Sequence, residues 1–313
     1  MATRLEKLME RKPEKSTIKT FQHAFQFALS THDKWSLNRE KNSQGHNARR
    51  FMQQLEKFCE SDAIPIAYIA DDFNVKQIIN EMQDHYNWSD SSCNKFCSFL
   101  STTFKECLDH DMLAKMPRIP RKAETMGRTE WYTKEHVEQL CGYAKETERH
   151  KLADLMLFAA YTGLRQQELR KLKRRDFDYK LNVPLIHVGG TKDSITKTGN
   201  YRTVQLPERI HELAERLCYH KDANDLIFGE DWINRQQINR AFNPVKSVVK
   251  TRVDGITDAH VFHTFRHTYG TWRIAAGSPI MDVKFAMGHS TVAMTERYVH
   301  NTGGVSTQGD VRI

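Results

Sequence analysis

Arg165 and Glu168 are the first candidate site residues along this 313-residue chain. Arg165 comes directly after the turn-forming stretch 162–164, and Glu168 follows at i+3 on the same face of a predicted helix. A guanidinium fixed in this way presents a planar fork of donors that fits phosphate oxygens, and the carboxylate can hold it in place. Taken alone, the pair is more typical of an ordinary surface ion pair.

A second cationic group is indicated by His263 and Arg266, whose i, i+3 spacing points both side chains one way from a helix. Arg266 would clamp a phosphate from the side opposite Arg165. We interpret the neighbouring His267 as a structural or supporting residue. Isolated, this spacing is a weak signal.

Lys197 is the candidate proton donor. It lies in a polar loop between two strand-like runs, 183–188 and 201–206, which predict a β-hairpin. A lysine on such a loop can reach into a site and protonate a leaving oxygen. By itself it is typical of a surface lysine, and Lys192 in the same loop is the rival.

His289 and Tyr298 lie close to the end of the chain, before and within a predicted terminal helix that Ser290 would cap. Their separation allows the turn and the helix to fold back onto one site. A phenol has a pKa of about 10, so Tyr298 needs nearby cations and a base to act as a nucleophile. Without this context, such a tyrosine is normally a packing residue.

The elements that position these residues are mainly helical. Thr133 is a predicted N-cap for a helix over 134–143, and an apolar helix over 152–161 ends before Gly163. A short, very basic helix starts at Arg165, and residues 207–298 are mostly helical. With the hairpin, this part predicts a mainly α domain that carries a small antiparallel β-sheet.

Helical spacing also dominates the first part of the chain, with apolar stripes at 51–58, 75–82 and 96–107. The cap-like stretch 89–92 begins the last of these helices. A basic, proline-bearing stretch at 117–128 is the obvious boundary between two domains. The predicted organisation is a basic N-terminal segment 1–45, a helical core-binding (SAM-like) domain 46–116, the linker 117–128, a catalytic domain 129–301 and a C-terminal tail 302–313.

The net charge of +8 and the pI of about 9.1 favour a polyanionic partner. Charge is uneven: residues 1–50 hold eleven Lys or Arg against five Asp or Glu, whereas residues 51–90 hold two against eight. The acidic middle should face away from a DNA backbone. The basic side chains that we assign to DNA binding are Arg118, Arg121, Lys122, Arg128, Lys173 and Arg174.

Six scattered cysteines without paired spacing indicate reduced thiols in a cytosolic protein rather than disulfides or zinc. No apolar run approaches the length of about 20 residues that a membrane helix needs. No P-loop and no carboxylate cluster suited to magnesium is found. We therefore expect a cytoplasmic protein with no metal, no cofactor and no membrane partner.

Together, these segments resemble the tyrosine recombinases, the group that contains phage integrases and the Xer-type enzymes. The matching stretches are TGLRQQELRKLKRRDFD, TKTGNYRTVQLP, HTFRHTYGTW and MGHSTVAMTERYVH. The resemblance is close over 130–300 and vaguer over 45–117. Phe265 stands where leucine is more usual, and the first half is unusually acidic, which leaves that half's DNA footprint open.

The resemblance implies a two-domain clamp on duplex DNA that cleaves and rejoins DNA through a 3′-phosphotyrosyl intermediate. The implied catalytic set is Arg165, Lys197, His263, Arg266, His289 and Tyr298, with Glu168 in support. His263 would take or share the tyrosine proton. Implied partners are double-stranded DNA at core attachment sites, three further copies of the chain in a tetramer that exchanges residues 299–313, and, as further candidates, a host DNA-bending protein and an excisionase.

The basic N-terminal segment favours the integration or excision of a phage or mobile element. The resemblance implies a prokaryotic host cell, with the protein associated with the nucleoid. An Xer-like resolvase of chromosomes or plasmids is the alternative within the family. A type IB topoisomerase shares most of the same residues but relaxes DNA. A DNA-binding regulator without catalysis is the alternative from another class, and the complete residue set argues against it.

Overall fold

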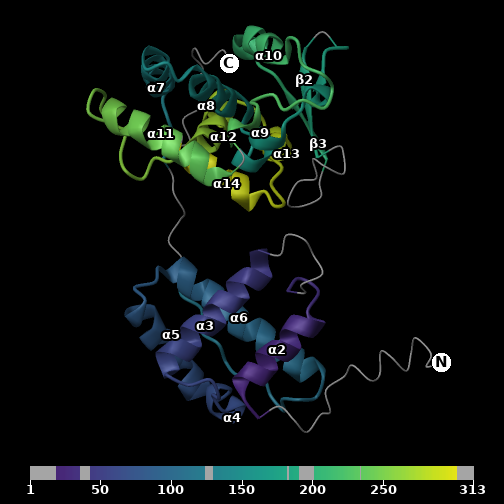
Figure 1. Ribbon diagram of the computed structural model, residues 1–313, viewed down its shortest axis with the longest axis vertical. Helices are drawn as coiled ribbons and strands as arrows, with labels where there is room; N and C mark the ends of the chain where they lie inside the picture. Colours follow the sequence, from purple (N-terminus) through teal and green to yellow (C-terminus); the bar gives the residue numbers. More distant parts are fainter. Residues whose placement is uncertain are drawn as a thin grey trace, which may run out of the picture. The chain divides into compact units, whose positions relative to one another are not determined.

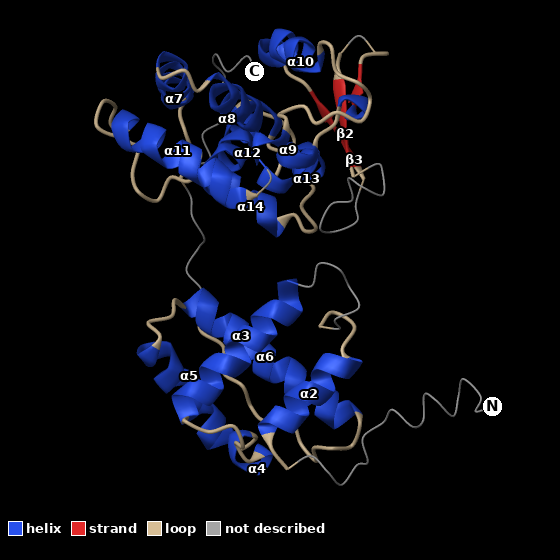
Figure 2. Ribbon diagram, in the orientation of Figure 1, coloured by secondary structure: helices blue, strands red, loops and turns tan. Residues whose placement is uncertain are grey.

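The computed structural model describes residues 19–35, 43–123, 130–181, 183–189, 201–232 and 234–301. The chain forms two compact units that divide after Thr125, within the predicted linker 117–128 (Figure 1). The units are mainly helical, and the second carries one small antiparallel sheet (Figure 2), as predicted. Within the described ranges, no helix has both the length and the apolar character to cross a membrane.

Helices build the described part of the first unit. They are α2 (Phe21–Thr31), α3 (Ser43–Cys59), α4 (Ile66–Ile69), α5 (Asp72–His85) and α6 (Asp90–Asp109). The three predicted stripes lie in α3, α5 and α6, where most of their apolar side chains are buried in one core. Ser89 caps α6 by accepting a hydrogen bond from the backbone N–H of Ser92 at 3.3 Å. Cys97 and Cys107 are buried in this core.

The prediction of a separate segment over 1–45 is wrong for α2, which is part of the first helical unit. Phe21 and Phe25 are buried, and their rings pack on that of Phe99 in α6 with centroids 5.9 and 5.6 Å apart. Trp35 is also buried in this core. Net charge was the wrong guide here, because α2 itself contains no Lys, Arg, Asp or Glu and buries an apolar stripe.

The second unit is built from helices and a short sheet. Its α-helices are α7 (Lys134–Glu146), α8 (His150–Thr162), α9 (Gln166–Lys171), α10 (His211–Cys218), α11 (Arg235–Val249), α12 (Thr264–Ala275), α13 (Ile280–Met287) and α14 (Ala293–Asn301). Thr133 caps α7, as predicted, with its hydroxyl accepting from the backbone N–H of His136 at 3.1 Å. Gly163 ends α8 in the left-handed region, at φ 63°.

The predicted hairpin is present as β2 (Leu185–Val188) and β3 (Arg202–Gln205), which pair antiparallel with Ile186 opposite Val204. A third strand, β1 (Phe177–Asp178), extends the sheet on the other side of β2 and was not predicted. It is too short to show a period. In Figure 2 the sheet lies at one side of the second unit, with α10 and α13 beside it.

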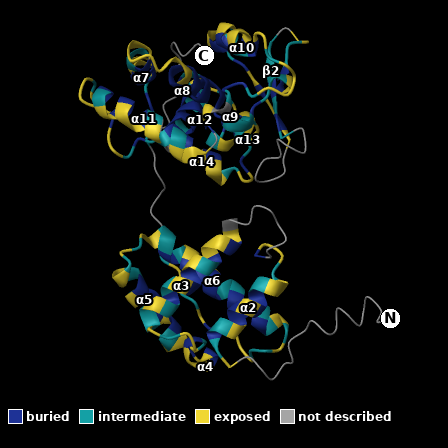
Figure 3. Cartoon of the chain, in the orientation of Figure 1, coloured by how far each residue is buried: buried dark blue, intermediate teal, exposed yellow. Residues whose placement is uncertain are grey.

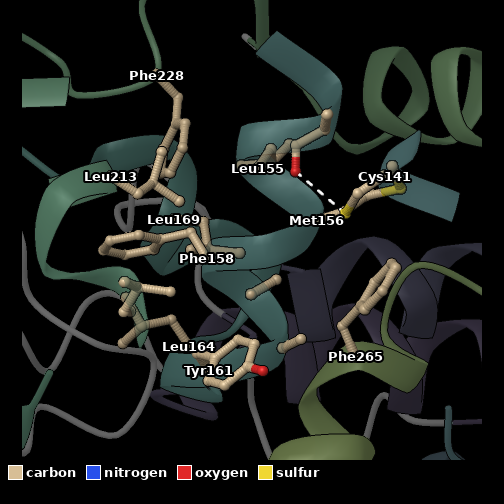
Figure 4. Close-up of a cluster of buried hydrophobic side chains, with 14 of the residues drawn as sticks. Cys141, Leu155, Met156, Phe158, Tyr161, Leu164, Leu169, Leu213, Phe228 and Phe265 are labelled. Atoms are coloured by element: carbon tan, nitrogen blue, oxygen red, sulfur yellow. Dashed lines mark hydrogen bonds between the residues drawn. The ribbon is translucent and has the colours of Figure 1, made fainter. Parts of the chain in front are cut away.

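The core of the second unit surrounds α8, which is buried along nearly its whole length (Figure 3). Phe158 of α8 packs against Phe228, with ring centroids 5.4 Å apart, and lies close to Leu213 of α10 (Figure 4). Because α8 contacts both α7 and α12, the apolar core fixes the position of the turn at Gly163 relative to α12. This turn and α12 carry the two arginines predicted for the site.

Candidate active site

Arg165 stands at the start of α9 in an extended conformation, directly after the turn that ends α8. Its guanidinium donates from Nη1 to Oε1 of Glu168 at 3.0 Å, and its backbone N–H donates to Oε2 at 2.7 Å. The contact between these two residues, expected from their spacing, is therefore present. Nη2 of Arg165 donates to the backbone carbonyl of Gly288 at 2.8 Å.

Arg266 lies on α12 and is buried, with 4% of its surface exposed. Nη1 donates to the carbonyl of Gly163 at 2.7 Å, and Nη2 donates to the carbonyl of Met287 at 2.5 Å. Burial and the nearby charge of Arg165 lower the pKa of Arg266 to about 9, so its guanidinium stays protonated at neutral pH.

The two guanidiniums are held by consecutive carbonyls at the C-terminal end of α13, since Arg165 binds Gly288 and Arg266 binds Met287. Carbonyls at a helix C-terminus carry partial negative charge and stabilise nearby cations. This arrangement keeps two like charges at one turn without neutralising either. These carbonyls can accept from the arginines because α13 ends at this turn, where Gly288 lies in the left-handed region at φ 64°.

His289 follows this turn and is buried. Its Nδ1 lies 2.9 Å from the hydroxyl of Thr295, and its ring is nearly parallel to that of Tyr298, with centroids 6.1 Å apart. Burial and the charge of Arg266 lower the pKa of His289 to about 3. The imidazole is therefore neutral at physiological pH.

Tyr298, on α14, has only 1% of its surface exposed. Its hydroxyl lies 3.1 Å from Nδ1 of His267, and its ring lies against Gly270, where an added Cβ would come within 2.7 Å of Cε2. Burial raises the pKa of Tyr298, although Arg266 acts in the opposite direction. In this structure the phenol is therefore a protonated, buried group.

The imidazole beside the phenol is that of His267, not that of His263, which was expected to take or share the tyrosine proton. His263 is the residue before α12, not part of its first turn, and its ring centroid lies 5.1 Å from that of His267. His267 and Gly270 share the α12 face on which α14 packs, because they are three residues apart. Burial and Arg266 lower the pKa of His263 to about 4, and burial and His263 lower that of His267 to about 3.

Arg202 belongs to the same cluster and was not singled out from the sequence. It is buried at the start of β3, and both of its terminal nitrogens donate to the Glu168 carboxylate. A signal was present: the alternation along β3 places Arg202 on the same face as Val204 and Leu206, so a charge had to be buried there. Its partner, distant in sequence, could not be read from that pattern.

The remaining predicted residues divide into two groups. Lys197, its rival Lys192 and Arg128 lie outside the described residues. Arg121 donates to the Asn94 carbonyl at 2.6 Å and to the Ser98 hydroxyl at 2.7 Å, so part of the predicted linker is attached to α6. The other predicted DNA-binding side chains are Arg118, which is exposed, Lys122, which donates to Asn80, and Lys173 and Arg174, which are partly exposed beside β1.

The cluster can bind and polarise a phosphate. Three guanidiniums, those of Arg165, Arg202 and Arg266, surround the single carboxylate of Glu168, which leaves an excess of positive charge at the end of α13. Neutral imidazoles and a phenol stand beside it. Among the described residues, no group of three His, Cys, Asp or Glu side chains could hold a metal ion.

Comparisons with known proteins assign the chain to one family. A model of the phage integrase family matches residues 130–303. The chain is 27% identical over 254 residues to a "Tyrosine recombinase XerC-like" protein of Caldanaerobacter subterraneus subsp. tengcongensis, covering 69% of this chain and 65% of that relative. It is 27% identical over 199 residues to tyrosine recombinase XerD of Listeria innocua, covering 62% of this chain. The alignments thus span just under two thirds of both relatives, at 65% each.

Solved structures share the fold. A Tn1549 transposon integrase in complex with transposon right end DNA superposes with a TM-score of 0.73 at 16% identity, covering 91% of this chain and 97% of that one. A lambda integrase dimer bound to a COC' core site gives a TM-score of 0.66 at 15% identity, covering 93% of this chain and 79% of that one. At these identities the likeness is one of fold alone.

Proposed function

Because this chain belongs to the phage integrase family of tyrosine recombinases, we propose that it cleaves and rejoins duplex DNA at specific sites, with Tyr298 as the nucleophile. The observation that carries the proposal is the meeting of Arg165 and Arg266 at consecutive carbonyls of one turn, next to His289 and the ring of Tyr298. These are the side chains that attack on a phosphodiester requires, and they come from four separate segments of the chain.

In the proposed reaction, the oxygen of Tyr298 attacks the scissile phosphorus and forms a 3′-phosphotyrosyl bond, while the bond to the 5′-oxygen breaks. Arg165 and Arg266 neutralise the charge that builds on the non-bridging oxygens. His289 donates a hydrogen bond to the phosphate, and Lys197 protonates the departing 5′-oxygen. Attack by a 5′-hydroxyl reverses these steps and rejoins the strand.

The structure constrains how the tyrosine proton leaves. The imidazole next to the hydroxyl is that of His267, at 3.1 Å, whereas the His263 ring contacts the His267 ring, with centroids 5.1 Å apart. Since Tyr298 is 1% exposed, its side chain must leave this position before it meets a phosphate. We propose that His267 holds the phenol before cleavage and that His263 accepts its proton during attack.

We further propose that four copies act together on two DNA sites, with exchange of residues 299–313, and that the DNA is that of a phage or mobile element. The matched relatives named XerC and XerD support the alternative of a resolvase. Recombination assays separate the two, because a resolvase recombines two copies of one site, whereas an integrase joins two different sites. A host DNA-bending protein and an excisionase, if required, would be added in the same assay.

The test is covalent trapping on DNA of unknown sequence. A pool of duplexes with a nick inside a randomised region is incubated with the full chain. The short fragment between the cleavage point and the nick diffuses away, which prevents rejoining. Complexes that survive SDS are isolated and their DNA is sequenced.

We expect wild-type protein to give an adduct on a recurring sequence and Tyr298→Phe to give none, although the variant still binds that sequence. An adduct in Tyr298→Phe would assign the nucleophile to another residue. The absence of an adduct with wild-type protein on every duplex that it binds would overturn the proposed activity.

A further inference from the structure

Arg202 joins β3 to two other elements of the site, α9 and α13. Its Nη1 donates to Oε1 of Glu168 at 3.0 Å and its Nη2 donates to Oε2 at 2.7 Å, which is a bidentate ion pair. Its Nε donates to the carbonyl of Ala286, near the end of α13, at 2.7 Å. Only 8% of Arg202 is exposed, so these contacts lie largely out of water.

Glu168 is shared between two arginines. Each of its oxygens accepts from Arg202 and also from Arg165, once through the guanidinium and once through the backbone N–H. Burial alone would raise the pKa of Glu168, but the hydrogen bonds and charge of Arg202 outweigh it, and the pKa is lowered. The carboxylate is therefore ionised, and its negative charge is divided between two cations.

The same side chain packs under the turn that precedes His289. A Cβ on Gly288 would come within 3.1 Å of Cδ and 3.2 Å of Nη1 of Arg202. The Gly288 carbonyl accepts from Arg165, and the Ala286 carbonyl accepts from Arg202. Arg202 thus contacts both residues that flank Met287, whose own carbonyl binds Arg266.

We propose that Arg202 is a positioning residue for DNA cleavage, which orients Arg165 through Glu168 and fixes the turn at 286–289. Without Arg202, Glu168 would pair with Arg165 one to one, and this neutral pair would stabilise the charge that builds on the phosphate during cleavage less. The proposal rests on the proposed function, since the orientation of Arg165 matters only if a phosphate reacts there. It predicts a loss in the cleavage step that exceeds any loss in DNA binding.

The experiment compares variants of the full chain on the duplex that wild-type protein traps. Single-turnover adduct formation gives the cleavage rate, and a gel-shift titration gives the affinity. We expect Arg202→Met to slow cleavage about 10- to 100-fold, below the loss of about 100- to 1000-fold typical when a direct transition-state donor is removed. Affinity should change less than about threefold, and Arg202→Lys should fall between Arg202→Met and wild type.

Charge rescue separates positioning from folding. Adding Glu168→Gln to Arg202→Met removes the negative charge that would otherwise neutralise Arg165 but keeps an amide oxygen that can accept hydrogen bonds from Arg165, so the double variant should cleave faster than Arg202→Met alone. A merely structural loss predicts the opposite, because the double variant lacks more native contacts. This comparison holds even where Arg202→Met lowers the melting temperature.

Arg216 supplies the matched control. It forms a bidentate pair with Asp154 at 3.0 and 2.8 Å in the same unit, on α10 and α8, away from the turn at 286–289. Arg216→Met should cleave at a rate within about twofold of wild type. The proposal is overturned if Arg202→Met cleaves like Arg216→Met, or if the double variant is slower than Arg202→Met. If wild-type protein traps no duplex, it is the proposed function that fails.

Discussion

The hydroxyl of Tyr298 lies 3.1 Å from Nδ1 of His267, and the two residues come from packed helices, α14 and α12. Because the tyrosine is buried, this hydrogen bond has no competition from water. An unpaired hydroxyl in such a place costs about 1–3 kcal/mol. The contact therefore stabilises the position of the phenol that is seen here.

Replacing His267 should weaken this position in a graded way. We expect His267→Leu to lower the free energy of unfolding by about 1–3 kcal/mol, because it leaves the Tyr298 hydroxyl without a partner. His267→Gln, whose amide can still reach the hydroxyl, should lose less. Urea unfolding monitored by circular dichroism measures both. Equal losses in the two variants would show that the hydrogen bond is not what stabilises the tyrosine.

A methyl group at position 270 should displace the tyrosine ring. An alanine Cβ there would lie 2.7 to 2.9 Å from three ring atoms of Tyr298, so Gly270→Ala should destabilise the second unit even though alanine favours helices by about 1 kcal/mol. Gly142 on α7 is the control, because an added Cβ there meets nothing within 4 Å. Gly142→Ala should raise the melting temperature.

The same substitution should become favourable once the ring is removed. In a Tyr298→Ala background, we expect Gly270→Ala to raise the melting temperature, since only the helix preference remains. A thermodynamic cycle over the four proteins gives the coupling between positions 270 and 298. A coupling near zero would mean that the ring moves aside at no cost.

Acid should destabilise the second unit through its neutral histidines. An unfolded histidine takes up a proton near pH 6.5, whereas His263 is held neutral down to about pH 4 and His289 down to about pH 3. Between these values the unfolded chain binds more protons, so stability falls as the pH falls from about 6.5 to about 4, by at most about 1.4 kcal/mol per pH unit for each histidine.

Comparing variants isolates this effect from the carboxylates. We expect His289→Asn, which can keep the contact to Thr295, to show a shallower decline of unfolding free energy over this pH range than wild type. Urea titrations at half-unit pH steps measure the two slopes. Parallel slopes would show that His289 does not titrate differently in the folded and unfolded chain.

Adduct formation should need neither metal nor nucleotide. Arg165, Arg266 and Lys197 supply the positive charge in the proposed mechanism, and the phosphotyrosyl bond retains the energy of the broken phosphodiester. We expect the trapped complex to form at an unchanged rate in EDTA without ATP. A strict requirement for magnesium in the cleavage step would contradict the mechanism, and the test uses the same nicked duplex.

Local patterns in the sequence predicted most of the helical frame. The caps Ser89 and Thr133 and the helix end at Gly163 each depend on a few neighbouring residues, and each is confirmed. The strand β1 was missed because two residues show no alternation. The helix α2 was assigned to a separate segment because charge was weighed above its apolar spacing.

The sequence predicted one contact of the candidate site but neither the residue beside the Tyr298 hydroxyl nor the partner of Glu168 on β3. Helix spacing placed Arg165 beside Glu168, and the structure shows that contact. Spacing along one helix cannot tell which face meets α14, so the contact of His267 with the Tyr298 hydroxyl was not predicted. The pairing of Arg202 with Glu168 joins a strand to a distant helix, and no local pattern specifies it.

The end of α13 has a consequence for how this protein can vary. Its last carbonyls orient both Arg165 and Arg266, and each residue of a helix turns the chain by roughly 100°. Inserting or deleting a single residue within its eight would rotate both acceptors away from both guanidiniums at once. Substitutions on the exposed side of α13, as at Met281 and Phe285, do not rotate the end of the helix, so both acceptors stay in place. We therefore expect α13 to tolerate changes of composition and to reject changes of length.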